Sequence, residues 1–315
     1  MKIVVTGAAG FIGSHLAEKL AGVGHEVVGI DCFTDYYSVA LKEQNAADVR
    51  AAGASVLDLD LAEDPLEAAI LGADAIYHSA AQPGISRTTP FEVYLRNNIV
   101  ATHRLLEAAM TLRARPFFVN ISTSSVYGKH ATDAEDAAPK PASNYGVTKL
   151  AAEQLALSYY RDKGLPACSL RLFSVYGPRE RPDKLYPKLI GCILDGKPFP
   201  LFEGSREHSR SFTYVGDIVA GLVAALEHAK DAVGEIFNIG SDVEMTTGRG
   251  IEIVEEIMGA KAKFEAVPKR AGDQLHTRAN IEKARRVLGY DPKTGPEEGL
   301  RAEVEWYRAA FGRKA

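Results

Sequence analysis

The chain has 315 residues, of which 46% are hydrophobic and 25% are charged. These proportions are ordinary for a globular protein and exclude a disordered chain, a collagen-like repeat and a coiled coil. With 37 lysines and arginines against 41 aspartates and glutamates, the formal charge is −4, which argues against a general nucleic-acid binder. The longest apolar runs are far shorter than the roughly 20 residues of a membrane span. We therefore expect neither nucleic acid nor membrane as a partner.

The N-terminus and the cysteines indicate the compartment. The first residues hold one lysine and then enter an apolar run and a glycine turn, so we expect no signal peptide. The three cysteines, Cys32, Cys168 and Cys192, have neither disulfide nor metal-site spacing. Such a set is typical of a reducing compartment. The sequence therefore predicts a cytoplasmic protein without a metal site.

Short apolar runs alternate with helical periodicity through the first part of the chain. This alternation predicts strands at residues 3–6, 27–30, 55–59, 75–78, 117–121 and 167–172, and helices at 12–23, 91–113 and 145–163. Strands that are apolar on both faces and alternate with helices predict an α/β protein with a Rossmann-type, doubly wound parallel sheet. In such a sheet, ligands bind beyond the carboxyl ends of the strands.

The pattern changes after about Tyr176, where prolines and glycines interrupt a looser segment. A strand follows at residues 235–239, and helices are expected at 250–258, 281–288 and 295–311. We therefore expect residues 1–175 to form the sheet domain, with 212–240 crossing back to it. Residues 176–211 and 241–315 would then form a smaller mixed α/β lobe.

A glycine-rich turn lies between the first strand and the first helix. It has the sequence GAAGFIG from residue 7 to residue 13. Glycines there allow a tight turn and a close approach of phosphate, and the helix start offers N–H groups to a pyrophosphate. A turn that merely needs small residues is the alternative. The candidate cofactor contacts are Gly7, Gly10, Phe11, Ile12 and Gly13.

Asp31 follows the second strand and bears on the choice of cofactor. A carboxylate at this place accepts hydrogen bonds from an adenosine ribose and repels a 2′-phosphate. The sequence therefore favours NAD over NADP, with a solvated acidic strand end as the alternative.

Tyr145 and Lys149 lie one turn apart in the helix expected at 145–163, so their side chains share a face. A phenol titrates near pH 10 and becomes a useful base only where cations favour its phenolate. A lysine and an oxidised nicotinamide ring are two such cations. Hydroxyls at residues 122–125, after the fifth strand, can hold a sugar hydroxyl in line with the phenolate. Chance spacing and a turn at a strand end are the alternatives.

Together these motifs resemble the extended short-chain dehydrogenase/reductases, in the NAD-dependent epimerase/dehydratase family that acts on nucleotide sugars. The resemblance runs along nearly the whole chain. Beyond the glycine turn, Asp31 and the Tyr–Lys pair, it rests on Asn98 and on DL at 60–61, HSAAQ at 78–82, VYG at 126–128, LRLFSVYGP at 170–178, RSFTYV at 210–215, NIG at 238–240 and RAGD at 270–273.

The resemblance implies a role for each matching residue. Tyr145, Lys149 and Thr123 would be catalytic, with Thr123 bridging the sugar 4-hydroxyl to the phenol and Lys149 also binding the nicotinamide ribose. Further NAD contacts are implied at Asp60, Leu61, Ala80 and Asn98. Contacts to the nucleotide diphosphate and its ribose are implied at Arg210, Arg270 and Asp273. Guanidinium groups suit a diphosphate, although exposed solubilising charges are the alternative.

Members of this family share one first step, removal of hydride from C4 to give a 4-keto sugar. The 4,6-dehydratases then use an Asp–Glu pair where this chain has Ser124 and Ser125, and a serine hydroxyl is a poor acid and base. UDP-glucuronate decarboxylases usually have Glu at position 125. The sequence therefore favours a 4-epimerase, an isomerase that returns the hydride to the opposite face of the sugar, with both serines facing the substrate.

Ser174 and Arg181 bear on the choice of sugar. UDP-glucose 4-epimerases usually have Asn at position 174, whereas UDP-glucuronate 4-epimerases usually have Thr there and resemble this chain around Arg181. A hydroxyl and a guanidinium would clamp a C6 carboxylate in a bidentate arrangement and so hinder loss of CO₂ from the β-keto acid intermediate. We expect UDP-glucuronate and UDP-galacturonate as substrates. UDP-glucose or another UDP-sugar is the nearest rival, and a surface charge is the alternative for Arg181.

Two further implications come from the family. A catalytically silent NAD-binding regulator is the alternative from a different class, but such proteins characteristically lose the tyrosine or the lysine. The helices expected at 91–113 and 145–163 resemble those that form a four-helix dimer interface, so the resemblance implies a homodimer.

Overall fold

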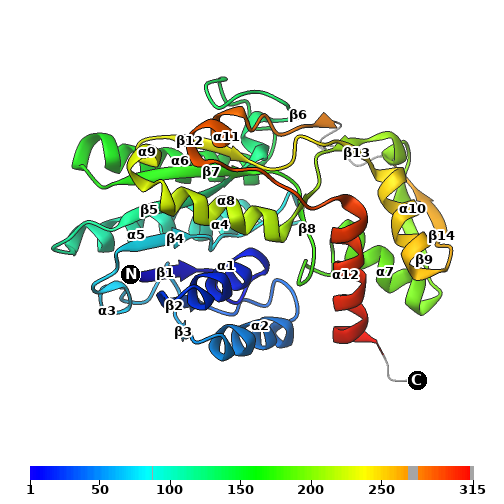
Figure 1. Ribbon diagram of the computed structural model, residues 1–315, viewed down its shortest axis with the longest axis horizontal. Helices are drawn as coiled ribbons and strands as arrows, with labels where there is room; N and C mark the ends of the chain where they lie inside the picture. The colour runs from blue at the N-terminus through cyan, green and yellow to red at the C-terminus, as the bar shows by residue number, and fades with distance from the viewer. Residues whose placement is uncertain (87, 269–275, 313–315) are drawn as a thin grey trace.

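A parallel sheet of seven strands lies at the centre of the computed structural model, which describes residues 1–86, 88–268 and 276–312 (Figure 1). The strand order is β12-β7-β5-β4-β1-β2-β3, so the direction of winding reverses between β1 and β4. In sheets of this type, a ligand-binding crevice opens at that reversal. The strands are β1 (Lys2–Thr6), β2 (Glu26–Asp31), β3 (Ser55–Asp58), β4 (Ala75–His78), β5 (Phe117–Thr123), β7 (Ala167–Leu172) and β12 (Ile236–Ile239).

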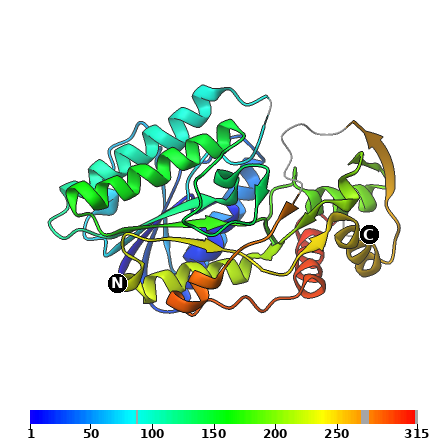
Figure 2. The same ribbon diagram turned by 90° about the horizontal axis from the view of Figure 1, so that it is seen from above.

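Helices cover both faces of this sheet (Figure 2). Because successive side chains of a strand point to opposite faces, Val5 and Tyr77 join the core on one side and Val4 and Ile76 the core on the other. The first side carries α1 (Phe11–Gly22), α2 (Val39–Ala51), α8 (Val215–Glu227) and α11 (Glu282–Leu288). The second carries α3 (Glu67–Ile70), α5 (Ala101–Thr111) and α6 (Asn144–Lys163).

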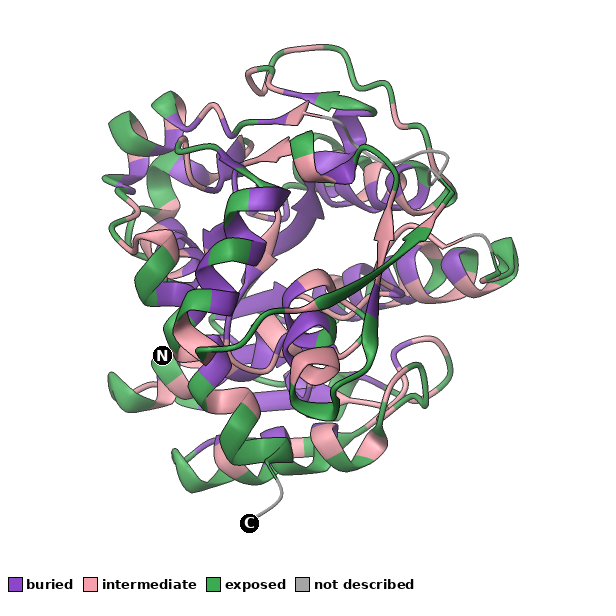
Figure 3. Ribbon diagram, turned by 90° about the vertical axis from the view of Figure 1, so that its right-hand side faces the viewer, coloured by how far each residue is buried: buried purple, intermediate pink, exposed green. Residues whose placement is uncertain are grey.

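A smaller lobe lies beyond the carboxyl ends of the strands, at the right of Figure 1. It has a hydrophobic core of its own, which includes Tyr186, Leu189, Ile251 and Val304, and Figure 3 shows this lobe with buried residues in purple. Its longer elements are α7 (Leu185–Asp195), β9 (Pro198–Phe202), α10 (Thr247–Met258), β14 (Lys263–Val267) and α12 (Pro296–Phe311), and β9 pairs with β14.

Short elements complete the chain. They connect the two lobes and shape the loops around the strand ends. They are η2 (Ser124–Tyr127), β6 (His130–Ala131), β8 (Val175–Tyr176), η3 (Ser205–Glu207), β10 (Ser209–Arg210), β11 (Thr213–Tyr214), α9 (Ala229–Ala232), β13 (Met245–Thr246) and β15 (His276–Thr277). Among the described residues, none of the helices has both the length and the apolar character needed to cross a bilayer.

The predicted fold class is confirmed, with two differences in the elements. The helix expected at 91–113 consists of α4 (Phe91–Tyr94), a π-helical segment η1 (Leu95–Val100) and α5 in direct succession. The helices α2 and α8 were not expected. In α2, Lys42 and Asn45 point inward, which hides the apolar periodicity, and α8 is apolar around most of its circumference.

The division into lobes remains a proposal, and the structure changes one part of it. Residues 279–290 were expected in the smaller lobe. Instead, Ala279, Ala284, Leu288 and Tyr290 belong to the core on the α1 side of the sheet. The reason is that α11 packs against α8 and β12, which themselves cover and extend the sheet. We therefore propose that this stretch belongs to the larger lobe.

Candidate active site

A cleft of about 610 Å³ opens where the carboxyl ends of the strands face the smaller lobe. Most of the predicted site residues line it, although they come from distant parts of the chain. They are Gly7, Gly10, Phe11, Ile12, Gly13, Asp31, Asp60, Leu61, Ala80, Thr123, Ser124, Ser125, Tyr145, Lys149, Ser174, Arg181 and Arg210. Asn98 is described but does not line the cleft, and the predictions at Arg270 and Asp273 lie outside the described residues.

The glycine turn has room for a phosphate group but not for side chains. A Cβ on Gly13 would lie 2.1 Å from the carbonyl oxygen of Gly7, and a Cβ on Gly7 would lie 2.9 Å from the backbone nitrogen of Ala80. Gly7 also has a φ of +72°, in the left-handed region. Because α1 begins at Phe11, directly after the turn, its first N–H groups face the cleft. These residues fit the pyrophosphate of a dinucleotide.

Asp31 joins this turn to the end of β2. Its Oδ2 accepts a hydrogen bond from the N–H of Ala9 (3.0 Å), and its Oδ1 accepts one from the N–H of Phe33 (2.9 Å). Burial raises the pKa of Asp31, while these two N–H groups and Lys42 oppose the rise. Each carboxylate oxygen keeps a further lone pair with which to accept from ribose hydroxyls. The side chain is therefore fixed in place before a cofactor arrives.

Two neighbours complete this end of the cleft. Asp60 forms an ion pair with Arg96 (2.7 Å) and accepts from the N–H of Ala62 (2.8 Å), so its loop is held against η1. Lys42 was missed from the sequence. It lines the cleft and donates to the carbonyl and hydroxyl oxygens of Thr34 (2.7 and 2.9 Å). The sequence gave no signal for it, because the helix α2 that carries it was not expected.

Ala80, in the wall of the cleft, is fixed by a chain of hydrogen bonds that includes the buried side chain of His78. The N–H of Ala80 donates to Thr6 Oγ1 (3.1 Å), which lies 3.0 Å from His78 Nδ1. On the other side, His78 Nε2 lies 2.8 Å from Thr102 Oγ1, which donates to the carbonyl of Asn98 (2.6 Å). Burial lowers the pKa of His78 to about 3, so the ring is neutral. Since Thr102 donates its proton to Asn98, we assign the ring hydrogen to Nε2.

The structure corrects the predicted cofactor contact at Asn98. This side chain is buried behind the wall, and Asn97 lines the cleft instead. Asn98 accepts from the N–H of Gln82 (2.7 Å) and donates to the carbonyl of Gln82 (3.2 Å) and to Thr148 Oγ1 (3.0 Å). With its amide used in this way, Asn98 ties the loop after β4 to α6 rather than binding a ligand.

Tyr145 lies in the first turn of α6, and its phenol is hydrogen-bonded to Thr123 at the end of β5. Thr123 Oγ1 accepts from the N–H of Ser125 (3.2 Å), so its own hydrogen can be donated to the phenol oxygen. Burial raises the pKa of Tyr145, and the hydrogen bond to Thr123 and the charge of Arg181 oppose the rise. The sequence predicted Lys149 in this role. The lysine lies one turn along the same helix, and Arg181 adds a positive charge that the sequence analysis did not assign to the phenol.

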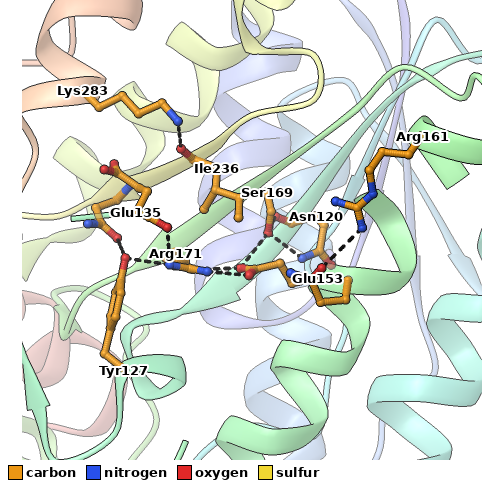
Figure 4. Close-up of polar contacts among 11 residues, drawn as sticks. Asn120, Tyr127, Glu135, Glu153, Arg161, Ser169, Arg171, Ile236 and Lys283 are labelled. Atoms are coloured by element: carbon orange, nitrogen blue, oxygen red, sulfur yellow. Dashed lines mark hydrogen bonds and ion pairs between the residues drawn. The ribbon is translucent and has the colours of Figure 1, made fainter. Parts of the chain in front are cut away.

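Lys149 lies one turn along α6, with 3% of its surface exposed. Burial lowers its pKa to about 8, and Glu153, a further turn along, opposes the shift. Glu153 forms a buried, two-pronged ion pair with Arg171 (2.7 and 3.0 Å), and Arg171 also donates to Tyr127 Oη (2.7 Å; Figure 4). The helix that carries Tyr145 and Lys149 is thereby fixed to β7.

Arg181 is 6% exposed, so it is not the surface charge of the alternative interpretation. Its Nε and Nη2 each lie 3.1 Å from one carboxylate oxygen of Asp183, and its guanidinium lies over the ring of Tyr36. Its Nη1 is buried and has no partner among the described residues. Because Asp183 takes the guanidinium fork, a bidentate clamp on a carboxylate would need one contact from Nη1 and one from Ser174.

Sequence reasoning also missed the residues that the smaller lobe contributes. Lys184 and Lys188 line the cleft at the start of α7, one helical turn apart. With Arg181 and Arg210 they bring positive charge to one end of the cleft, as a diphosphate requires. Their spacing at the start of a helix was a signal. Further lining residues of this lobe include Phe199, Pro200, Leu201, Phe202, Ser205, His208, Phe212 and Thr247, and their irregular placement gave no signal.

A glycine turn at the reversal of a parallel sheet, with a tyrosine and a lysine in the same cleft, defines a dinucleotide-binding enzyme of the short-chain dehydrogenase/reductase class. The chain belongs to the NAD dependent epimerase/dehydratase family, whose model matches residues 3–240. The predicted family and the predicted cofactor, NAD, are both confirmed.

Relatives along the full length are consistent with this membership. The chain is 39% identical over 99% of both chains to a protein of Bacillus subtilis (strain 168) named "Uncharacterized UDP-glucose epimerase YtcB". It is 35% identical to "UDP-glucuronate 4-epimerase 6" of Arabidopsis thaliana, over 99% of this chain and 72% of that one. The crystal structure of UDP-glucuronic acid 4-epimerase from Bacillus cereus, in complex with UDP-glucuronic acid and NAD, has a TM-score of 0.93, with 38% identity over 99% and 100% of the two chains. The predicted enzyme class, an NAD-dependent 4-epimerase, is confirmed.

Proposed function

We propose that the protein interconverts UDP-glucuronate and UDP-galacturonate through a transient 4-keto sugar. The observation that carries this proposal is one cleft in which a hydrogen-bonded Thr123–Tyr145 pair shares a wall with Ser174 and Arg181. The first pair suits the C4 hydroxyl, and the second pair suits a carboxylate at C6. The Arabidopsis and Bacillus cereus relatives, which are named for UDP-glucuronate, support this choice.

The residues around C4 hold and move one proton. NAD, when bound, supplies the acceptor and donor of the hydride. The phenol oxygen of Tyr145 takes the proton of the 4-hydroxyl, and Thr123 holds that hydroxyl in line. The Thr123 hydroxyl and the Arg181 charge favour the phenolate against the cost of burial. Lys149 lies in the same cleft with a pKa of about 8, so it remains largely a cation at neutral pH. Returning the proton from Tyr145 completes the turnover.

The residues around C6 keep the substrate carboxylate in place. Nη1 of Arg181 is buried and unpaired among the described residues, so a carboxylate oxygen there would satisfy it. A 4-keto-glucuronate loses CO₂ when its C5–C6 bond aligns with the carbonyl π-system. A carboxylate held by Arg181 and Ser174 stays out of that alignment.

A UDP-glucose 4-epimerase is the second candidate, because the name of the Bacillus subtilis relative calls it a UDP-glucose epimerase. The chemistry at C4 would be the same for both, and the two candidates differ at C6. Dehydration and decarboxylation are disfavoured because Ser124 and Ser125 stand in the cleft where a base or an acid would be needed.

Substrate profiling separates the candidates. The purified protein is incubated with NAD and either UDP-glucuronate or UDP-glucose, and proton NMR of the anomeric region follows the products. We expect UDP-galacturonate to form from UDP-glucuronate. Conversion of UDP-glucose alone would contradict the choice of sugar, but it would still agree with the 4-epimerase reaction. A 4-keto-pentose or a 4-keto-6-deoxy sugar as the end product would contradict the reaction itself.

We also propose a homodimer in the cytoplasm. The helices α4–α5 and α6 lie side by side on the outside of the sheet (Figure 2) and expose the apolar side chains of Phe91, Leu95, Val100 and Val147. A second copy would cover this face. The cysteine thiols are free, as in a reducing compartment. Light scattering tests the dimer, and Val147→Glu should shift it to a monomer. A monomeric parent protein would contradict the proposal.

A further inference from the structure

Two carboxyl groups are buried together beside the cleft, and no catalytic step described above uses them. Glu180 lies on the loop before α7 and lines the cleft, and Glu303 lies on α12. Their side chains are within hydrogen-bonding reach of each other. Only 8% of Glu180 and 0% of Glu303 is exposed. Buried carboxyl groups of this kind need a partner or a proton.

The surroundings of the pair favour a shared proton. Oε2 of Glu180 and both oxygens of Glu303 lack a donor in good geometry among the described residues. Burial raises the pKa of both groups. The charge of Glu180 and its hydrogen bond raise the pKa of Glu303 further, and the Gly177 backbone opposes that rise. The pKa of Glu180 is held down in part by Lys184, by the hydrogen bond with Glu303 and by Arg181. Two adjacent buried carboxylates repel each other. One of the two groups therefore stays protonated and donates a hydrogen bond to the other.

Other titratable groups near the pair leave this balance intact. Asp183, on the same loop, adds negative charge near Glu180. The groups that face Glu303 from β8, α7 and β11 are the phenols of Tyr176, Tyr186 and Tyr214, and burial raises the pKa of each above its ordinary value. They therefore remain neutral around pH 7. Arg210 acts on Tyr186 from β10.

The three residues of the segment 179–181 contact three different parts of the molecule. Arg179 has a φ of +70° and binds Glu18 (2.6 Å) and Asp48 (2.9 Å) of α1 and α2, in the larger lobe. Glu180 reaches α12 in the smaller lobe. Arg181 lies in the cleft, with the backbone of Gly84 beside it. The position of the Arg181 guanidinium therefore depends on how its two neighbours are held.

The packing of α12 brings Glu303 to this segment. Gly299 lies one turn before Glu303, on the same face of the helix. A Cβ on Gly299 would lie 2.2 Å from Tyr176 Oη, so the helix lies directly against β8. The segment 179–181 follows β8 by only a few residues. The carboxyl of Glu303 is thus presented from a closely packed helix rather than from a loop.

We propose that Glu303 is a positioning residue, which shares one proton with Glu180 and thereby holds Arg181 where its Nη1 meets the carboxylate of the sugar. The idea rests on the proposed function, because it assumes that Arg181 binds that carboxylate. When the shared proton is lost, the two carboxylates repel, the segment shifts and Arg181 loses its alignment. The consequence is a KM for UDP-glucuronate that rises with pH, while kcat follows the groups at C4.

The test is Glu303→Gln, compared with the parent protein from about pH 6 to about pH 9. A glutamine amide donates to Glu180 as the protonated acid does, but it has no proton to lose. We expect similar KM values at the lower end. At the upper end, the parent KM should rise by roughly tenfold, the cost of one hydrogen bond to a charged group, while that of the variant stays nearly flat. Glu180→Gln should also give a flat profile.

Glu255→Gln is the matched control, because this buried carboxylate of the same lobe has a cationic partner in Lys261. Its KM profile should follow that of the parent. Parallel profiles for the parent and Glu303→Gln, or a difference confined to kcat, would overturn the positioning role. If Glu303→Gln does not fold, Glu180→Gln decides by the same comparison. A parent protein that leaves UDP-glucuronate unchanged would overturn the proposed function instead, and the two failures are distinguishable.

Discussion

Burial works against the ionisation that Tyr145 needs. The side chain is half-buried in the cleft. Burial raises the pKa of its phenol, and Thr123 and Arg181 oppose the rise. With the function proposed above, Arg181 has two roles, as a partner of the sugar carboxylate and as a charge near the phenol. An oxidised nicotinamide ring would add a further positive charge there. The phenolate is therefore expected only in the loaded site.

Replacing Tyr145 by phenylalanine should remove the acid–base group and leave the cleft intact. We expect kcat to fall by about 10²- to 10⁴-fold, the usual contribution of a positioned proton-transfer group. NAD binding should persist, since Asp31 and the glycine turn are untouched. Turnover is followed by NMR and NAD binding by calorimetry. Tyr160→Phe, on the exposed side of the same helix, is the control. Equal kcat for Tyr145→Phe and the parent would contradict the assignment.

Replacing Arg181 by alanine should affect the two rival sugars differently. For UDP-glucuronate, we expect KM to rise by about tenfold or more, since a hydrogen bond to a charged group is lost. We also expect some release of CO₂ and a 4-keto-pentose, because the carboxylate is no longer held. Mass spectrometry detects both the pentose and the epimer. The exposed Arg249, replaced by alanine, serves as the control. Unchanged KM without any keto-pentose would contradict the clamp.

Among single residues, those that belong to short motifs could be predicted from the sequence. Gly13, Asp31 and Tyr145 could be located because a strand end or a helical turn fixes where their side chains go. Glu303 could not, since it meets a segment more than 120 residues away in the chain. Lys42 could not, since it lies on α2, a helix that the sequence did not predict. Asn98 belongs to a motif, but the π-helical segment turns Asn97 rather than Asn98 toward the cleft.

In the glycine turn at the start of α1, a single added Cβ atom would distort the backbone. In Gly13→Ala, the added Cβ would lie 2.1 Å from the carbonyl oxygen of Gly7, so the turn must open. We expect NAD affinity to fall by at least about tenfold. Gly22→Ala, in the last turn of the same helix, is the control, because a Cβ there meets nothing within 4 Å. That variant should bind NAD normally and gain up to about 1 kcal/mol in stability. Calorimetry with NAD measures the first effect, and equal affinities for the two variants would contradict it.

Elements with a simple apolar period could be predicted, and those with a mixed face could not. Apart from the exposed edge strand β3, the strands of the sheet are largely buried, and apolar runs locate the strands within a residue or two. The helix α2 uses Lys42 and Asn45 on its inner face to bind backbone oxygens of two loops. Polar residues that point inward hide a helix from a prediction based on hydrophobicity.

For the molecule as a whole, the two lobes meet at the cleft through the segment 179–181. Arg179 binds the helices of the larger lobe, and Glu180 lies against α12 of the smaller one. Nothing in the local sequence indicates these partners, since Glu18 and Glu303 are more than 120 residues away from the segment in opposite directions. The topology of the sheet follows from the sequence, but the joint between the lobes required the structure.

The buried acid pair predicts how stability depends on pH. Burial raises the pKa of Glu180 and Glu303 in the folded state above the ordinary value near 4.5. The folded protein therefore binds more protons than the unfolded chain above that pH, and its stability falls as the pH rises through the raised values. In Glu303→Gln this loss should be smaller, by about 1.4 kcal/mol for each tenfold difference in proton affinity that the substitution abolishes. Urea unfolding from about pH 4 to about pH 9 tests this. A difference between the two proteins that stays constant with pH would contradict it.

The central claim is that the hydrogen at C4 leaves and returns without exchanging with water. The most direct measurement is to run the conversion of UDP-glucuronate in D₂O and examine C4 of the UDP-galacturonate by NMR and mass spectrometry. We expect protium at C4, because the same hydride returns to the opposite face of the sugar. Deuterium at C4 would show that a proton rather than a hydride is exchanged, and it would contradict the roles given to NAD and Tyr145.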